Sequence, residues 1–271
     1  MKKIILIIFT AISCIGVPAQ VSHEVSIHGG GGLSTLYYKL PDGTRLAGGG
    51  GEFGIGYTCF FNKYIGVHLG ADIAFYNAKA KLDGLKVVSS NLTDNEGDIF
   101  DMHTTLSKYS ETQKSMFLNI PIMAHIQTKR FYALGGVKMG IPLQCNHNAS
   151  DVTIDNKGYY PEYNNWITDV EFQGYGTFSN INSSEKLPFK IAASLAFETG
   201  IKYNFGKNFA LFVGIYFDYG LNNIVKKGDH PFINYNTNAP ANFTTNSAIP
   251  SLVERINPMA LGVKVRFAFI K

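Results

Sequence analysis

Ten charged side chains recur at alternate positions within segments that are otherwise rich in glycine and aliphatic residues. They are Glu24, Glu52, Asp72, Lys138, Lys190, Glu198, Lys202, Asp218, Lys264 and Arg266. Successive side chains of a β-strand point to opposite faces, so these residues would share one face with the glycines. An isolated charge away from water is costly, whereas acids and bases in equal number can pair. We therefore predict a paired internal network, and we weigh a gated ion path as the alternative.

Two particular contacts follow from counting residues outward from the turns near positions 129 and 207. The count places Lys138 opposite Glu198, and we predict a cross-strand ion pair between them. The same count brings Glu52 near Asp72. Since like charges repel, one of these two carboxylates would need a basic neighbour or a bound proton.

Other residues that could do chemistry do not form a recognisable site. His68 and Asp72 share a strand face, but their spacing of four residues separates them by about 13 Å, too far for a hydrogen bond. The glycine runs at 29–32 and 48–51 lack the Lys-Ser or Lys-Thr of a phosphate-binding loop, and curvature relief explains them better. Cys59 and Cys145 lack ligand spacing. We expect no catalytic, cofactor or metal site, with a lipid-modifying enzyme as the less favoured alternative.

The composition narrows the class of protein. The chain has 271 residues with 28 Gly, 20 Phe, 15 Tyr and a single Trp, and its mean hydropathy is +0.01. Many glycines and aromatics with few charges exclude a disordered chain, a coiled coil and a polytopic helical membrane protein. The net charge of +4 is small and dispersed, which argues against nucleic-acid binding.

The N-terminus indicates export. Lys2 and Lys3 precede an apolar run at 4–12, and Val17-Pro18-Ala19 provides a small-residue cleavage site. We expect residues 1–19 to be a cleaved signal peptide and residues 20–271 to form one domain.

The segments that carry these charges have the alternating pattern of β-strands. Alternate residues from Phe209 to Tyr219 and from Met259 to Phe269 are apolar, and similar alternation runs through 65–76, 116–127 and 190–205, with weaker versions from 24, 52 and 131. Short turns fall at 62–63, 128–130 and 206–208, and longer loops near 39–48, 81–113, 145–187 and 222–256. This pattern predicts an all-β fold: an eight-stranded antiparallel transmembrane up-and-down β-barrel with short periplasmic turns and long extracellular loops. A soluble lipocalin-like barrel or sandwich is the alternative, and aromatic residues beside the short turns favour the membrane.

A resemblance to known proteins rests on the signal peptide, the glycine and aromatic strands, the turn pattern and the last strand from Leu261 to Phe269. These features resemble the porin-like outer-membrane β-barrel proteins grouped with PorT and, more distantly, OmpX and the OmpA barrel. The resemblance implies an outer-membrane location and a role linked to protein secretion. Many such barrels end on an aromatic residue, whereas here Ile270 and Lys271 follow Phe269.

Side chains can fill the interior of an eight-stranded barrel, which leaves no aqueous channel. Function would then reside in the loops. The third long loop carries the aromatic residues Tyr159, Tyr160, Tyr163, Trp166, Phe172 and Tyr175 among many Asn and Gly. Such rings amid short polar residues are typical of recognition surfaces, and they also suit loops that pack on one another. Strand extensions at 152–154 and 170–172 would stiffen the loops. We predict a monomeric, closed, structural or surface-interaction protein surrounded by outer-membrane lipid, with a protein or glycan partner at the loops; a small-solute channel is the alternative.

Overall fold

The structure, a computed structural model, describes residues 22–40, 43–226 and 232–271. The proposed signal peptide lies outside these ranges. The strands are β1 (Ser22–Tyr37), β2 (Gly43–Ala47), β3 (Gly49–Phe60), β4 (Ile65–Leu82), β5 (Leu85–Thr93), β6 (Ile99–Gln127), β7 (Phe131–Tyr160), β8 (Asn165–Ile167), β9 (Gly176–Lys186), β10 (Ala192–Phe205), β11 (Phe209–Gly220), β12 (Ile233–Asn234), β13 (Thr244–Thr245) and β14 (Asn257–Ile270). Two short helical segments are η1 (Glu171–Gln173) and α2 (Ala248–Leu252). Within the described ranges, no helix is long and apolar enough to cross a membrane.

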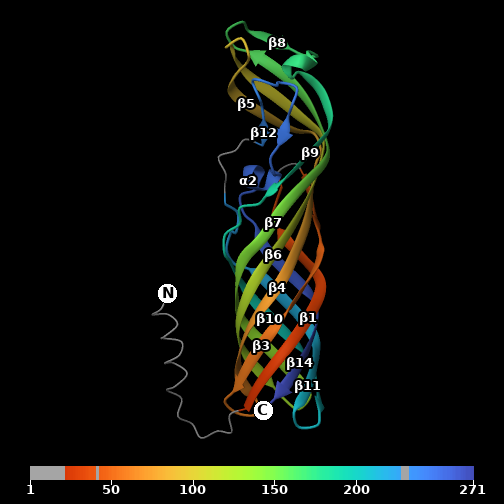
Figure 1. The fold of residues 1–271 in the computed structure, drawn as a ribbon, viewed down its shortest axis with the longest axis vertical. Coiled ribbons are helices and arrows are strands. Elements are labelled where there is room, and N and C mark those ends of the chain that lie inside the picture. Colours follow the sequence, from red (N-terminus) through yellow and green to blue (C-terminus); the bar gives the residue numbers. More distant parts are fainter. Residues whose placement is uncertain (1–21, 41–42, 227–231) are drawn as a thin grey trace, which may run out of the picture.

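Eight of these strands close into a ring. The antiparallel pairings run β1–β3–β4–β6–β7–β10–β11–β14, and β14 pairs back with β1. Figure 1 shows the ring as the lower part of an elongated molecule. The predicted antiparallel all-β fold built on eight strands is therefore confirmed.

The two ends of the ring differ. Residues 61–64, 128–130 and 206–208 make short connections at one end, where the prediction placed turns. At the other end, β6 and β7 are 29 and 30 residues long and continue past the ring to pair with β5, β8 and β9. Much of what was predicted as loop at 81–113 and 145–187 is therefore strand. The segment 152–154 lies in β7, but residues 170–172 run into the 3-10 helix η1 and not into a strand.

The outer face of the ring is apolar, as the alternating pattern requires. On β6 the outward residues from Met116 to Ile126 are apolar, and Ile126 is 55 % exposed. Ten residue steps at about 3.3 Å each, tilted by about 40°, span about 25 Å, which is the height of the apolar band of a transmembrane barrel. We call this face the apolar belt; Phe75 of β4 and Leu143 of β7 lie at its upper limit, beside Met116.

A β-bulge in β6 exchanges the two faces of the strand above the belt. The β6–β7 register shifts twice between Leu106 and Ser110. Below the bulge, even-numbered residues of β6 point outward; above it, the even-numbered Phe100, Met102 and Leu106 are fully buried. An extra residue in one strand turns the following side chains to the opposite face. The extension consequently has an apolar inner side of its own.

That inner side is covered by the segment between β11 and β14. One buried cluster joins this segment to the extension. The segment contributes Phe232, Ile233, Phe243 and Ala248. The residues that they pack with lie on β5, β6, β7 and the segment before β9, and include Phe100, Met102, Leu106, Val152, Ile154 and Tyr175. Figure 1 shows β12 and α2 above the ring, alongside the extended strands. The extension is thus a packed layer of strands and not a set of loose loops.

Glycine pairs allow the strands of the ring to approach closely. Gly200 of β10 lies opposite Gly214 of β11, and a Cβ added at Gly200 would overlap the carbonyl oxygen of Val213. A Cβ added at Gly214 would lie 2.5 Å from the hydroxyl oxygen of Tyr132. Large inward rings thus cover glycine backbone, which is a recognised way of building a tightly curved sheet.

Candidate functional site

The interior of the ring holds a continuous chain of six charged side chains. Glu198 accepts a hydrogen bond from Arg266 at 2.7 Å and pairs with Lys264 at 3.2 Å. Lys264 also pairs with Glu52, which Lys138 contacts at 3.1 Å. Lys138 completes the chain by donating to Asp218 at 2.7 Å. Three acids meet three bases, and all six are buried.

This chain of ion pairs crosses the interior. Glu52 lies on β3 and Lys138 on β7, and β4 and β6 separate these strands in the ring. Their contact therefore bridges the space between strands that are not neighbours. The Tyr216 ring lies 5.0 Å from the ammonium of Lys264 and 5.9 Å from that of Lys138. Aromatic and paired charged side chains together occupy the middle of the ring.

Two further pairs lie outside this chain. Lys202 donates to Glu24 at 3.0 Å and to Gln127 at 2.7 Å. The imidazole of His28 lies 2.8 Å from a carboxylate oxygen of Asp72. The sequence predicted a basic neighbour or a bound proton for one of these two carboxylates; in the structure Lys138 and Lys264 contact Glu52, and His28 contacts Asp72.

The structure corrects two of the sequence expectations for this network. The predicted contact of Lys138 with Glu198 is wrong, because Lys138 lies opposite Ser194 and Glu198 lies opposite Leu134. Lys190 is not an interior residue: it precedes β10, its side chain is exposed, and its backbone N–H donates to Ile224. The structure brings the other nine predicted residues into the ion pairs described above.

A polar anchor that the sequence reading missed lies where the extension begins. Glu111 of β6 is fully buried and accepts hydrogen bonds from the Ser247 hydroxyl at 2.5 Å, the Ala248 backbone N–H at 2.8 Å and the Tyr109 hydroxyl at 2.6 Å. Ser247 also caps the N-terminus of α2 by accepting from Ile249. Burial, followed by the charge of Glu111, raises the pKa of Tyr109 well above its usual value.

A signal for this anchor exists in the sequence. Glu111 continues the inward, odd-numbered series that runs from 117 to 127 in the same strand. Extending that parity upward by three positions marks a carboxylate on the inner face, where it needs donors.

The six aromatic residues predicted as a recognition surface divide into two groups. Tyr160 and Tyr175 are buried, and their hydroxyls lie 2.8 Å apart within the core of the extension, so they do not belong to an exposed surface. Tyr163, Trp166 and Phe172 are 58 %, 51 % and 74 % exposed. Tyr159 is half-buried, and its ring lies 4.9 Å from that of Trp166.

The distal end is held by a tight turn. Asp94, between β5 and β6, accepts backbone N–H bonds from Glu96 and Asp98, both at 2.9 Å, and the Tyr160 hydroxyl at 2.9 Å. Burial of Asp94 acts to raise the pKa of its carboxyl, but these hydrogen bonds outweigh it and lower the pKa. The β5–β6 turn is thereby fixed to the end of β7.

The two described cysteines, and His68 and His147, have contacts that do not suit nucleophilic catalysis. Cys59 and Cys145 are both free. His68 contacts the Thr58 hydroxyl at 2.9 Å, deep within the ring. Ser247 donates to Glu111 and not to His147, whose Nδ1 lies 3.8 Å from Glu111, so these three residues do not form a nucleophile–base–acid relay.

A closed antiparallel ring with an apolar outside and a charge-paired inside defines a β-barrel of the kind that resides in a membrane. The family model described as "Outer membrane protein beta-barrel domain" matches residues 19–226. The chain belongs to this family, and its place is the outer membrane.

Solved structures that are similar to this chain share little sequence identity with it. Ail of Yersinia pestis is 10 % identical, with 92 % of this chain and 98 % of that chain covered and a TM-score of 0.30. Ail in complex with the heparin analogue sucrose octasulfate gives 11 % identity, 93 % and 99 % coverage and a TM-score of 0.29. OprG of Pseudomonas aeruginosa gives 11 % identity, 93 % and 96 % coverage and a TM-score of 0.33. No curated protein matches the chain.

Proposed function

We propose that this protein is a closed, non-enzymatic outer-membrane barrel that acts through its surface, with the short turns toward the periplasm and the strand extension outside the cell. The observation that carries the proposal is the extension of β6 and β7 beyond the apolar belt, with exposed aromatic residues at its far end. Aromatic side chains are enriched at protein interfaces, and a packed support holds them without much loss of entropy on binding.

The partner in this proposal is a protein that contacts the distal aromatic residues. A photo-crosslinking amino acid at position 163 is expected to form an adduct with a protein in intact cells, and the yield should fall several-fold when Trp166 is replaced by Ala. The same crosslinker at position 207, in a short turn at the other end of the ring, is the control. An adduct of equal yield with Trp166→Ala would contradict the proposal, and an adduct only with polysaccharide would make the partner a glycan.

A closed interior is supported by the ion pairs that bridge β3 and β7. Because a chain of paired charges crosses the ring, we expect no steady ionic conductance when the purified protein is inserted into planar bilayers. Substitutions that neutralise Lys138 or Glu198 should not create a steady conductance of fixed size either. A stable wild-type conductance that either substitution alters would instead favour the small-solute channel.

The non-enzymatic part of the proposal is supported by the separate partners of His28, His68 and Ser247 described above. Unchanged outer-membrane lipid profiles in cells carrying single histidine substitutions are expected, whereas loss of a lipid modification in one of them would favour an enzyme. The relation to PorT-type proteins, and with it a link to protein secretion, stays part of this proposal. Measuring secreted protein in a deletion strain tests that link.

A further inference from the structure

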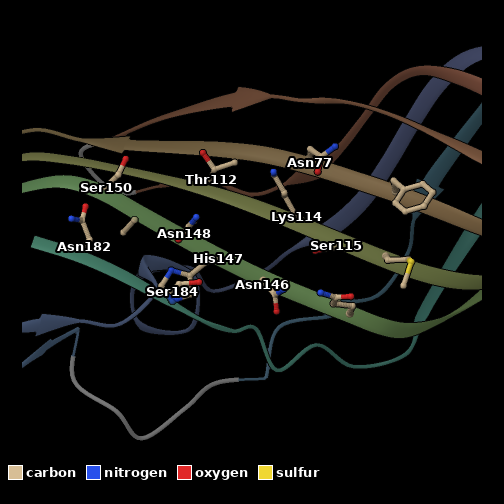
Figure 2. Close-up of a pocket in the computed structure, with 14 residues that line it drawn as sticks. Asn77, Thr112, Lys114, Ser115, Asn146, His147, Asn148, Ser150, Asn182 and Ser184 are labelled. Carbon is tan, nitrogen blue, oxygen red and sulfur yellow. The ribbon is translucent and has the colours of Figure 1, made fainter.

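A polar groove lies on the outer face of the extension, directly above the apolar belt. It is formed by β4, β6, β7 and β9 and has a volume of about 820 Å³, within the range of ligand pockets. Figure 2 shows its lining side chains on four neighbouring strands. Most are amides and hydroxyls: Asn77, Thr112, Gln144, Asn146, Asn148, Ser150, Asn182 and Ser184.

Strand register arranges these residues in rows that contain lysines and no acids. The lowest row runs Asn77, Lys114, Asn146 and Lys186 across the four strands. The next runs Lys79, Thr112, Asn148 and Ser184, and a third begins Lys81, Ser110 and Ser150. Cross-strand neighbours share a face, so all four lysines belong to the groove or its rim.

The positive charge of this face is not neutralised by the protein. The lysines Lys79, Lys81, Lys114 and Lys186 are exposed, and within the described ranges none has a carboxylate at ion-pair distance. The acid adjacent to Lys186, Glu185, lies opposite the inward residue His147 and so has the other parity. Four cations among amide and hydroxyl groups are complementary to an anionic, hydroxyl-rich ligand.

The lower edge of the groove identifies the form of that ligand. Phe75 and Met116 line the groove and are also the last outward apolar residues of β4 and β6 before Asn77 and Lys114. The groove therefore opens onto the apolar belt, where acyl chains would lie. A ligand that fits both parts has a polar anionic head and a hydrocarbon tail.

We propose that this groove binds the phosphorylated saccharide head group of a lipid in the outer leaflet of the outer membrane. Lys79, Lys114 and Lys186 would contact phosphate oxygens, the Asn, Ser and Thr side chains would hydrogen-bond sugar hydroxyls, and the acyl chains would follow the apolar belt. The inference rests on the orientation proposed above, with the extension outside the cell, and is independent of the partner proposed for the distal aromatic residues.

The test measures lipid binding to the purified full-length protein in mixed micelles by native mass spectrometry. The probes are diphosphorylated lipid A, the same lipid after dephosphorylation, and its acyl-free phosphorylated saccharide. The triple variant Lys79→Gln, Lys114→Gln and Lys186→Gln is expected to bind diphosphorylated lipid A about a hundredfold more weakly. The control is Lys63→Gln, Lys129→Gln and Lys207→Gln, which makes the same charge change in the exposed short turns and should bind normally.

A second variant covers the case in which the triple variant does not fold, as judged by gel mobility before and after boiling. Thr112→Trp fills the groove without changing its charge and should also abolish binding. Equal binding by wild type and both groove variants would overturn the proposal. So would equal losses in the two lysine triples, equal binding of the dephosphorylated lipid, or tighter binding of the acyl-free saccharide. Protease accessibility of the extension on intact cells tests the orientation separately.

Discussion

Replacing Glu198 by glutamine is expected to lower the free energy of unfolding by about 3 to 5 kcal/mol, because Arg266 loses the carboxylate with which it is paired inside the ring. Lys264 keeps Glu52, but the buried chain of charges becomes unbalanced by one positive charge. Glutamine has nearly the same size and shape as glutamate, and its oxygen can still accept a hydrogen bond. The substitution therefore removes the charge of residue 198 without leaving a cavity. The measurement is the urea midpoint of the compact gel band in reconstituted protein.

The matched control is Glu185→Gln, an exposed acid on β9 whose loss should change stability by less than about 0.5 kcal/mol. Combining Glu198→Gln with Arg266→Gln restores charge balance and should recover part of the loss, giving a measurable coupling energy. If Glu198→Gln unfolds at the wild-type midpoint, the ion pairs of Glu198 do not stabilise the ring.

Replacing Glu111 by alanine is expected to release the segment from β12 to α2 while leaving the ring intact. The Ser247 hydroxyl, the Ala248 N–H and the Tyr109 hydroxyl all lose their charged acceptor. Buried donors without a partner cost about 1 to 3 kcal/mol each, so even one such loss raises the population of the locally opened state about fivefold to about 150-fold. Hydrogen exchange of the amides of Ala248, Ile249, Ser251 and Leu252 measures this opening.

Ser247→Ala is the graded control, because it removes one donor to Glu111 and the helix cap but leaves the carboxylate with its other two bonds. It should open the segment less, by about 1 kcal/mol. Exchange of the β10–β11 amides should stay slow in both variants. Equal protection of residues 248–252 in wild type and Glu111→Ala would show that hydrophobic packing alone holds the segment.

The eight strands of the ring could be predicted from the sequence because each of them has its own alternation of apolar and other residues. The short turns also fix the register of the two strands within a hairpin. Register between hairpins is a different matter. β7 and β10 are joined by a long connection, and their stagger depends on how the whole ring closes. Counting from the turns therefore displaced Lys138 from its actual neighbour, Ser194, and assigned it to Glu198.

The extension was harder to predict for another reason. Its apolar residues are spaced as in the belt, so parity alone cannot tell whether Phe100 and Met102 face lipid or a protein core. The composition of the predicted loop does not show which rings pack on one another, and Tyr160 and Tyr175 lie in a buried cluster with Phe100 and with residues of the β12–α2 segment. The groove was missed because it needs four strands in register, whereas β9 and the part of β7 that lines the groove were expected to be loop.

The bulge between Leu106 and Ser110 changes which alternate residues of β6 face outward. The even-numbered residues of β6 face outward below the bulge, first in the apolar belt and then in the polar groove, whereas the even-numbered residues above it lie in a protein core. A single strand of 29 residues thereby belongs to two environments: a ring with its apolar side chains outside, and an extension with its apolar side chains inside. Substitutions beyond the bulge can reshape the exposed part of the molecule while the half that inserts into the bilayer keeps its own pattern.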